Sequence, residues 1–534
     1  MEKAVALAPL SRVRRFTMLE RFLPIGIQTF EKVRERNAVY IDKTDLVYRL
    51  VKSYSYVFLS RPRRFGKSLL VSTLRSYFEG RKDLFEGLAI EQLEKDWMQY
   101  PVLHFSLSLM RITSVDELGS MLDYLLRDME QIYGRGNAAD EAYGLRMANL
   151  VNRAYAQTGK KVVLLFDEYD APILDTMHDK TLMESVRQKL RQFYSPIKDL
   201  DSKLQFVFIT GISKFSQLSI FSELNNLTTI TMNNEYAAIC GFTRDEIVTQ
   251  LAPEIENLAK AMHISVNTAL LRLKRKYDGY HFSKNSPDIY NPFSLLNCMA
   301  DKELYNYWFS SGTPTHLIKQ LSQYTLRPEE LEGFAAGEMD FYVPVEHAET
   351  PIPVLYQSGY VTIKSYRSGI YTLGFPNEEV RVSFIKGLAP YYTGQTVTGN
   401  NSFLIRLISS LNDGDVDKAM TLLRSFFSSI PYNAEKQDED HYKTIFYLIF
   451  TLSSEYSVRT EQCSAAGRCD ALIETEDTIY VFEFKLDGTA EEALKQIDDK
   501  GYAIQYEAGD KKIVKVGVNF EKDKRTIERW VISE

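Results

Sequence analysis

The sequence predicts an α/β protein with a doubly wound parallel sheet in its first half and a second α/β domain at its C-terminus. Short apolar runs alternate with amphipathic helical segments through the first 240 residues, which is typical of right-handed βαβ units. A new alternation of strands and helices begins near residue 400. At 534 residues the chain is long enough for about three domains of ordinary size.

Composition restricts the classes of function. The hydrophobic fraction of 45% and charged fraction of 25% are those of a globular protein, and the net charge of −7 excludes a global basic field, so any nucleic-acid contact must be local. The four cysteines are too few for a disulfide framework, and Cys463 and Cys469 lack the spacing of a zinc site. The longest apolar stretch, at 445–452, is far shorter than the roughly 20 residues that span a bilayer. We therefore expect a cytoplasmic protein without membrane contact.

A strand, loop and helix at 56–78 carry a phosphate-binding pattern. YVFLS is followed by RPRRFGKS, whose end matches the second half of G-x-x-x-x-G-K-[ST]. Backbone N–H groups and the helix N-terminus would attract phosphate, Lys67 would reach the β and γ phosphates, and Ser68 would hold Mg²⁺. One departure is that arginine occupies the first glycine position. The expected nucleotide-binding residues are Arg61, Arg63, Arg64, Phe65, Gly66, Lys67 and Ser68.

A second phosphate-related pattern lies about a hundred residues further on. KVVLLFDEYDAP is an apolar, β-branched run that ends in Asp167 and Glu168, as a buried parallel strand with a Walker B pattern does. Asp167 would orient the Mg²⁺ shell, and Glu168 would polarise the attacking water. Asp170 is a further acid to which the sequence assigns no role.

Three more apolar runs, at 102–108, 204–210 and 227–232, complete the predicted sheet. Thr210 ends the run that follows the Walker B strand. It is a candidate sensor of the γ-phosphate, and a residue of an ordinary strand-end turn is the equally open alternative.

A strand pair near the C-terminus carries the third pattern. GRCDALIETEDTIYVFEFKLDG reads as two strands around an acidic turn, with Asp470 at the start of the first and Glu483 and Lys485 at the end of the second. Residues two apart share a face of a strand, so Val481, Glu483 and Lys485 should point away from the core that Tyr480, Phe482, Phe484 and Leu486 face. Two neighbouring carboxylates repel unless a cation lies between them, and Mg²⁺ suits such ligands. The ion would activate water, and Lys485 would orient that water or neutralise charge.

Together these motifs resemble a family of AAA-ATPase-like proteins, common in bacteria, that carry a C-terminal PD-(D/E)xK nuclease-superfamily domain. The resemblance covers nearly the whole chain and also rests on YIDKT at 40–44, FITGISKFS, YDGYHFS at 277–283, YNPFSLL and YWFSSGTPTHL. In that family arginine at the position of Arg61 is usual. The resemblance implies that Glu455 is an additional metal ligand and that Gln496 belongs to the catalytic group with Asp470, Glu483 and Lys485.

The same resemblance suggests how the chain is divided. We expect an N-terminal tail at 1–22, a P-loop AAA-like ATPase domain at 23–240, a helical lid or winged-helix-like module at 241–399, and a restriction-endonuclease-like α/β domain at 400–534. In the module, Thr243 and Glu246 form a predicted capping box. The tyrosines of YDGYHFS could stack on a base, but we expect them to fill a core, and we expect His281 to have an ordinary partner.

These patterns predict a protein that binds and hydrolyses ATP with Mg²⁺ and couples it to cleavage of phosphodiester bonds, with DNA favoured over RNA. A rival interpretation is a signalling or scaffold ATPase that forms homo-oligomers and whose C-terminal domain only binds nucleic acid or a protein. A third keeps the folds without either activity.

Overall fold

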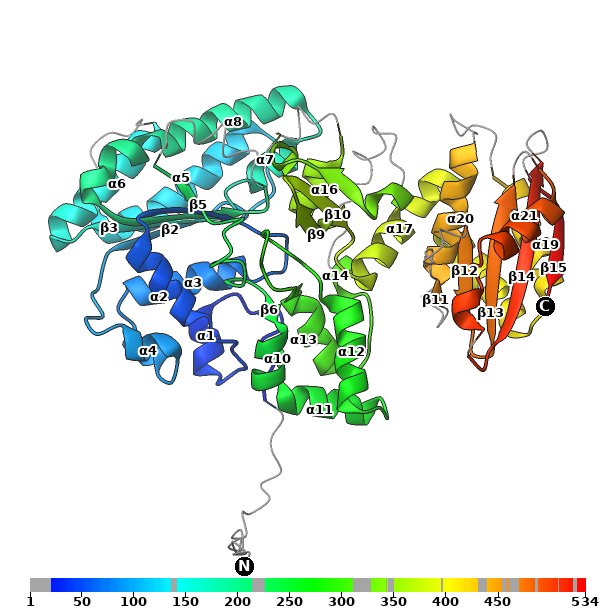
Figure 1. Ribbon diagram of the computed structural model, residues 1–534. Helices are drawn as coiled ribbons and strands as arrows, with labels where there is room; N and C mark the ends of the chain where they lie inside the picture. The colour runs from blue at the N-terminus through cyan, green and yellow to red at the C-terminus, as the bar shows by residue number, and fades with distance from the viewer. Residues whose placement is uncertain are drawn as a thin grey trace, which may run out of the picture.

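The computed structural model describes residues 21–135, 142–213, 226–310, 328–341, 343, 350–394, 397–430, 439–453, 459–460, 470–485, 488–507, 509–521 and 526–534. In Figure 1 the N-terminal sheet and the helices of the middle module form one body, and the C-terminal sheet lies apart from them. The two are joined through α17 (Glu378–Thr393), which packs against α20 (Glu439–Ser453). Among the described residues no helix is long and apolar enough to cross a membrane.

The N-terminal sheet is parallel throughout, as predicted. Its strands lie in the order β2 (Val102–Ser106), β3 (Val162–Asp167), β4 (Leu204–Gly211), β1 (Tyr56–Ser60) and β5 (Thr228–Thr229). The last strand is shorter than the expected run at 227–232. Because β4 lies between β1 and β3, the phosphate-binding loop and the acidic end of β3 flank the end of one strand.

Helices cover both faces of this sheet, because alternate side chains of its buried strands point to opposite sides. Val57 and Leu59 pack with α3 (Lys67–Phe78), while Tyr56 and Phe58 belong to a second core on the other face. That second core is built with α5 (Val115–Tyr133), α6 (Tyr143–Thr158) and α8 (Lys180–Tyr194). The other α-helices among the described residues of the domain are α1 (Phe30–Glu35), α2 (Thr44–Ser53), α4 (Ala89–Leu93) and α7 (Ala171–Thr176).

The middle module combines helices with a small antiparallel sheet. The helices are α10 (Arg244–Gln250), α11 (Ala252–Ala261), α12 (Val266–Tyr277), α13 (Pro292–Asp301), α14 (Tyr307–Ser310) and α16 (Ile352–Ser358). The sheet has the order β8 (Phe334–Ala336), β10 (Ile370–Gly374) and β9 (Thr362–Arg367). In a separate antiparallel pair, β6 (Phe242–Thr243) lies beside β7 (Ile289–Tyr290).

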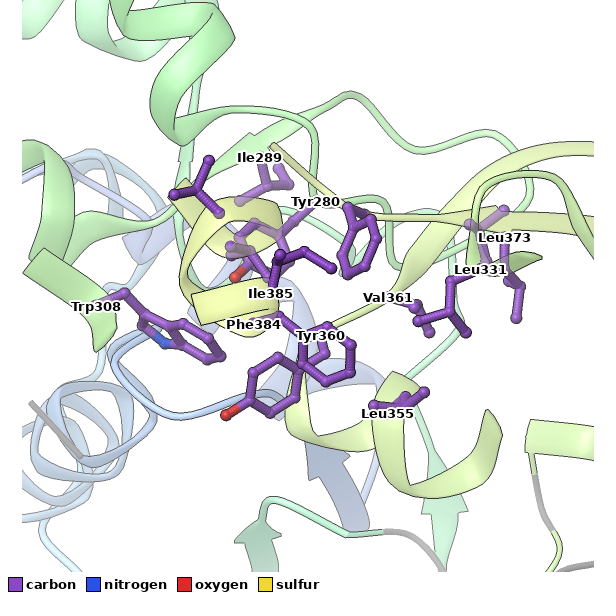
Figure 2. Packing of buried hydrophobic residues seen from close by; sticks show 14 of the residues in the cluster. Tyr280, Ile289, Trp308, Leu331, Leu355, Tyr360, Val361, Leu373, Phe384 and Ile385 are labelled. Carbon is purple, nitrogen blue, oxygen red and sulfur yellow. The ribbon is translucent and has the colours of Figure 1, made fainter. Parts of the chain in front are cut away.

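Two expectations for the module are confirmed. Thr243 and Glu246 form the capping box at the start of α10. Tyr277 and Tyr280 are buried, so these tyrosines of YDGYHFS fill a core, and Figure 2 shows Tyr280 in one cluster with Tyr360 and with Phe384 of α17. The ring Nδ1 of His281 lies 3.4 Å from Asp288 Oδ1.

The C-terminal sheet has the order β11 (Arg459–Thr460), β12 (Ala471–Glu474), β13 (Thr478–Lys485), β14 (Lys512–Glu521) and β15 (Thr526–Ser533). Only β13 and β14 are parallel neighbours, and α21 (Ala490–Asp499) connects them. One face packs against α19 (Val416–Ser428) and α20, and the other against α21. The expected boundary at 399/400 falls inside α18 (Val397–Asn412), which packs on α19.

Candidate functional site

The phosphate-binding loop makes its turn with two left-handed residues. Gly66, the N-cap of α3, has φ 90°, and Arg64 has φ 69°. In the described residues Arg61 is not among those with positive φ. Glycine is needed where φ is positive or where backbone must approach closely, so the first position of this loop does not need the conformational freedom of glycine. This explains how arginine can replace it.

Lys67 lies inside the loop that it completes. Its ammonium donates hydrogen bonds to the carbonyl oxygens of Arg61 and Pro62, both at 3.0 Å, and only 6% of the residue is exposed. Burial lowers the pKa of Lys67, while the nearby carboxylates of Asp167 and Glu168 act in the opposite direction. The structure therefore brings the expected lysine and the acids of β3 to one place.

Asp167 ends β3 beside the loop. Burial raises the pKa of its carboxyl group, and a hydrogen bond from Ser68 opposes that shift. Its Oδ1 atom is buried and accepts no hydrogen bond from the residues that the structure describes. A carboxylate and a hydroxyl with an unfilled acceptor suit Mg²⁺, which takes few protein ligands and keeps several waters. Ser68 and Asp167 are thus a fitting donor set for the ion.

Glu168 has φ 50° and lines the cavity in front of the loop. A non-glycine residue in the left-handed region costs of order 1–3 kcal/mol, and such residues cluster at functional sites. The cavity has a volume of about 760 Å³. It is lined by the phosphate-binding loop, by Glu168, by the segment 24–28 and by residues of the middle module such as Phe293 and Trp308.

The role of Asp170 is structural. It is buried and accepts hydrogen bonds from the backbone N–H groups of Ile212 (3.1 Å) and Ser213 (2.6 Å) and from the Ser213 hydroxyl (2.5 Å). The Tyr169 hydroxyl also donates to the carbonyl oxygen of Ser213, at 2.9 Å. Asp170 and Tyr169 therefore fix the turn after β3 to the end of β4. Sequence reasoning missed this because the partners are more than 40 positions away.

Two expected nucleotide-binding side chains lie outside the cavity. The Arg61 guanidinium is buried and bonded to protein carbonyl groups, which corrects the expectation that its side chain contacts nucleotide. The Thr210 hydroxyl donates to the carbonyl oxygen of Leu59 at 2.8 Å and is also fully buried. By contrast, Arg63, Arg64, Phe65, Gly66, Lys67 and Ser68 all line the cavity.

In the C-terminal domain, strand pairing places Asp470 beside Glu483. The antiparallel register pairs Ala471 with Phe482, so the preceding residue, Asp470, lies opposite Glu483 on the same face. The backbone N–H of Phe484 donates to Asp470 Oδ2 at 2.8 Å. The predicted alternation is also confirmed, because Tyr480 and Phe482 lie in one core cluster and Val481 in another. Leu486 lies outside the described residues.

Gln496 of α21 connects the two charged residues of β13. Its amide Nε2 donates to Glu483 Oε1, and its Oε1 accepts from the ammonium of Lys485. Glu483 is only 3% exposed. The structure thus brings together Asp470 at the start of β12, Glu483 and Lys485 at the end of β13, and Gln496 of α21.

Asp470 and Glu483 offer two carboxylates to a candidate Mg²⁺ site. Within the described part of the chain no three Asp, Glu, His or Cys side chains form a metal-binding group. Two carboxylates on one face are nevertheless a set that Mg²⁺ uses when phosphate and water complete its shell. Asp470 and Glu483 are the residues that would hold it. Glu455 lies outside the described residues.

Comparisons with known proteins agree with the two predicted domains. Residues 24–221 match the family model of predicted AAA-ATPases, and residues 437–530 match that of the PD-(D/E)XK nuclease superfamily. A protein of Azotobacter chroococcum mcd 1, described as "Uncharacterized protein in vnfD 5'region", is 35% identical over 535 residues, which is 96% of this chain and 99% of that protein. The chain therefore belongs to the AAA-ATPase-like family whose members carry a C-terminal PD-(D/E)XK nuclease-superfamily domain.

Two solved structures share much weaker similarity. The Orc1 protein of Aeropyrum pernix in complex with DNA has 10% identity and a TM-score of 0.25, covering 67% of this chain and 94% of that one. Cdc6p from Pyrobaculum aerophilum has 11% identity and a TM-score of 0.23, covering 66% and 93%. At such scores these likenesses carry no argument about the site.

Proposed function

We propose that this protein is an ATP-binding and ATP-hydrolysing P-loop protein whose C-terminal domain cleaves phosphodiester bonds in DNA with Mg²⁺. The observation that carries the proposal is the bridge that Gln496 makes between Glu483 and Lys485, opposite Asp470. In a solvated surface hairpin the carboxylate of Glu483 would be exposed to water, whereas here it is buried under α21. Burying a carboxylate is costly unless partners compensate for the lost hydration.

The residues of the chain divide the chemistry between them. The Lys485 ammonium is held beside Glu483, where it can neutralise charge that builds up on a phosphate in the transition state. Gln496 fixes the separation of these two groups through its two hydrogen bonds. Mg²⁺, when held by Asp470 and Glu483, would lower the pKa of a bound water and polarise the phosphate. At the other site, Lys67 and the loop would bind the β and γ phosphates, and Glu168 would orient water.

The test is cleavage of labelled single-stranded and duplex DNA, and of RNA, by the purified full chain with Mg²⁺. We expect Lys485→Ala to lose cleavage by at least a hundredfold, because one well-placed electrostatic group is worth about that factor or more. Lys495→Ala is the matched control, since Lys495 is exposed on α21 next to Gln496. Equal cleavage by Lys485→Ala and the control would rule out the proposed nuclease site.

Adding ATP to the same assay tests the coupling. Lys67→Ala should lose ATP hydrolysis and any effect of ATP on cleavage, while cleavage without ATP persists. If the protein hydrolyses ATP but cleaves no substrate, the signalling or scaffold ATPase becomes the better function. In that case the mass of the protein in solution should change when ATP is added.

A further inference from the structure

Aromatic residues of the middle module lie directly against the phosphate-binding loop. The ring of Phe65, next to Gly66, packs edge-on against Tyr280 (4.7 Å between centroids) and Phe282 (5.3 Å). The Arg61 guanidinium lies 4.3 Å from the centre of the Phe282 ring, and that of Arg64 lies 4.6 Å from the centre of Phe293. We call Tyr280, Phe282 and Phe293 the aromatic clamp. They belong to the YDGYHFS and YNPFSLL motifs.

Arg61 connects the loop to the clamp on the buried side of the loop. Arg61 is only 1% exposed, and its guanidinium donates to the carbonyl oxygens of Ser60 (2.9 Å), Thr231 (2.8 Å) and Tyr236 (3.2 Å). An unpaired buried charge would be strongly destabilising, but here carbonyl groups and the face of Phe282 surround it. Its position is therefore fixed by partners from both the ATPase domain and the middle module.

Arg64 connects the loop to the clamp from the cavity. Its left-handed backbone, with φ 69°, is disfavoured for a residue with a side chain. A guanidinium on an aromatic face is attracted by the ring, so the contact with Phe293 offsets part of the cost of that backbone conformation. Arg64 and Phe293 both line the cavity, which places this contact within reach of a bound nucleotide.

The backbone leaves little freedom for the loop to move alone. The N–H of Gly241 donates to the carbonyl oxygen of Phe65 at 3.1 Å. A Cβ atom on Gly359, at the end of α16, would lie 2.7 Å from Pro62. The loop is thus closely packed by the middle module, and close-packed interiors transmit displacements instead of absorbing them.

We propose that the aromatic clamp positions the nucleotide-binding loop and transmits its occupancy to the middle module and from there to the C-terminal domain. The proposal rests only on the nucleotide-binding part of the proposed function. Phosphates bound in the loop compete with the carbonyl oxygens of Arg61 and Pro62 for Lys67 and recruit the loop N–H groups. Any adjustment of Arg64 and Phe65 is then passed to the rings packed on them.

A continuous set of contacts leads from the clamp to α17. The Asn377 amide donates to the carbonyl oxygen of Asp278 at 3.0 Å, and the Asn377 side chain also caps α17. The N–H of His281 donates to the Thr362 hydroxyl of β9 at 2.8 Å. Figure 2 shows Tyr280 in the same cluster as Ile385 and Phe384 of α17.

The last step reaches the strand that carries Glu483 and Lys485. Helix α17 packs on α20, and Phe446 of α20 stacks on Phe484 of β13 with ring centroids 3.8 Å apart. The ring of Phe450 of α20 is tilted against that of Phe482, with ring centroids 5.4 Å apart. These rings lie on the face of β13 opposite to Glu483, so movement of α20 would change the support of the site without touching it.

The test measures hydrogen exchange of the full chain with Mg²⁺, with and without saturating ATP, beside the affinity for a fluorescent ATP analogue. In the wild type we expect ATP to slow exchange in α13, in α17 and in β13. Phe293→Leu should weaken ATP binding by about tenfold, the size of one cation–π contact in a sheltered site, and should remove the ATP effect in α17 and β13 at saturation. Phe334→Leu, a half-buried ring of β8, is the control and should behave as the wild type.

A double-mutant cycle identifies the contact. Arg64→Gly removes the guanidinium and relieves the left-handed backbone, so its combination with Phe293→Leu should cost less than the sum of the two single effects. Additive effects, or an ATP response of α17 and β13 that survives Phe293→Leu, would overturn the clamp. The clamp would also be overturned if ATP binds the wild type but changes hydrogen exchange only within the loop. Failure of the wild type to bind ATP would instead reject the proposed function, and the clamp with it, while absence of DNA cleavage affects neither measurement.

Discussion

A glycine with no catalytic group of its own, Gly517, determines how closely α21 packs on the C-terminal sheet. Gly517 of β14 pairs with Glu483 of β13, and α21 crosses the sheet directly above it. A Cβ atom there would collide with the carbonyl oxygen of Ala490 and lie 2.5 Å from the backbone N of Leu494. The helix can therefore approach the sheet closely only because residue 517 has no side chain. That approach is what allows Gln496 to reach Glu483 and Lys485.

Replacing this glycine should displace the helix. We expect Gly517→Ala to lower the free energy of unfolding by about 2–3 kcal/mol, because the clash is with backbone that cannot rotate away. Cleavage, if present in the wild type, should fall with it. Urea unfolding followed by circular dichroism is the measurement. Gly337→Ala is the control, since its added methyl group would find its nearest neighbour at 3.8 Å; equal stability of the two variants would contradict the prediction.

Residues with local chemical patterns could be predicted from the sequence, and residues with distant partners could not. Lys67, Ser68 and Asp167 lie together as the spacing of their motifs suggested. The roles of Asp170 and Gly517 depend on partners that only the folded chain brings near. Arg61 was assigned to the nucleotide because of its place in the motif, whereas its side chain binds protein carbonyl groups.

At the scale of elements, α17 is the support between the middle module and the C-terminal domain. Its second residue, Glu379, is fully buried and accepts a hydrogen bond from the backbone N–H of Trp308 at 2.7 Å. Burial raises the pKa of Glu379 to about 7, and the hydrogen bond from Trp308 opposes the shift. The environment of Glu379, at the start of α17, thus favours its neutral form.

This burial makes stability depend on pH. The unfolded carboxyl group titrates near about 4.3, so the folded chain binds this proton more tightly, and the associated stability is lost as pH rises from about 4.3 to about 7. Glutamine mimics the neutral acid at every pH. We expect Glu379→Gln to gain stability over the wild type between pH 5 and pH 8, by up to roughly 3 kcal/mol.

The measurement is thermal unfolding at both pH values. Glu378→Gln is the neighbouring control, because Glu378 lies 2.6 Å from Arg275 in an ion pair and should lose stability when neutralised. A Glu379→Gln difference that is the same at pH 5 and pH 8 would refute the assigned burial effect.

The strands of the N-terminal sheet were the most predictable elements, because buried parallel strands are continuous apolar runs. The residues at which elements begin and end were less predictable. The sheet needs only Thr228 and Thr229 from the run at 227–232, and α18 extends across the expected domain boundary. Edge pairing and helix packing set these limits, and neither has a local pattern in the sequence.

For the whole molecule, the main observation is that one hydrophobic cluster runs through every part. It includes Phe65 in the loop beside Gly66, Tyr280 and Phe384 in the middle, and Phe446 and Phe520 in the C-terminal domain. Units that share such a core should unfold together, since separating them would expose the shared apolar surface. We therefore expect the chain to respond to a ligand as one body, although Figure 1 shows the C-terminal sheet set apart.

The three tryptophans make this testable, because each reports a different part. Trp97 lies in the ATPase domain, Trp308 in the middle module and Trp530 on β15. In variants that keep one tryptophan and replace the other two by phenylalanine, we expect all three fluorescence transitions in urea to coincide. ATP at a hundred times its dissociation constant should then stabilise all three signals equally, by about 2.7 kcal/mol. A Trp530 transition that occurs separately and does not respond to ATP would show that the shared core does not couple the C-terminal domain to the nucleotide. In that case an ATP shift of the Trp97 and Trp308 transitions alone would still locate the nucleotide site in the first two parts of the chain.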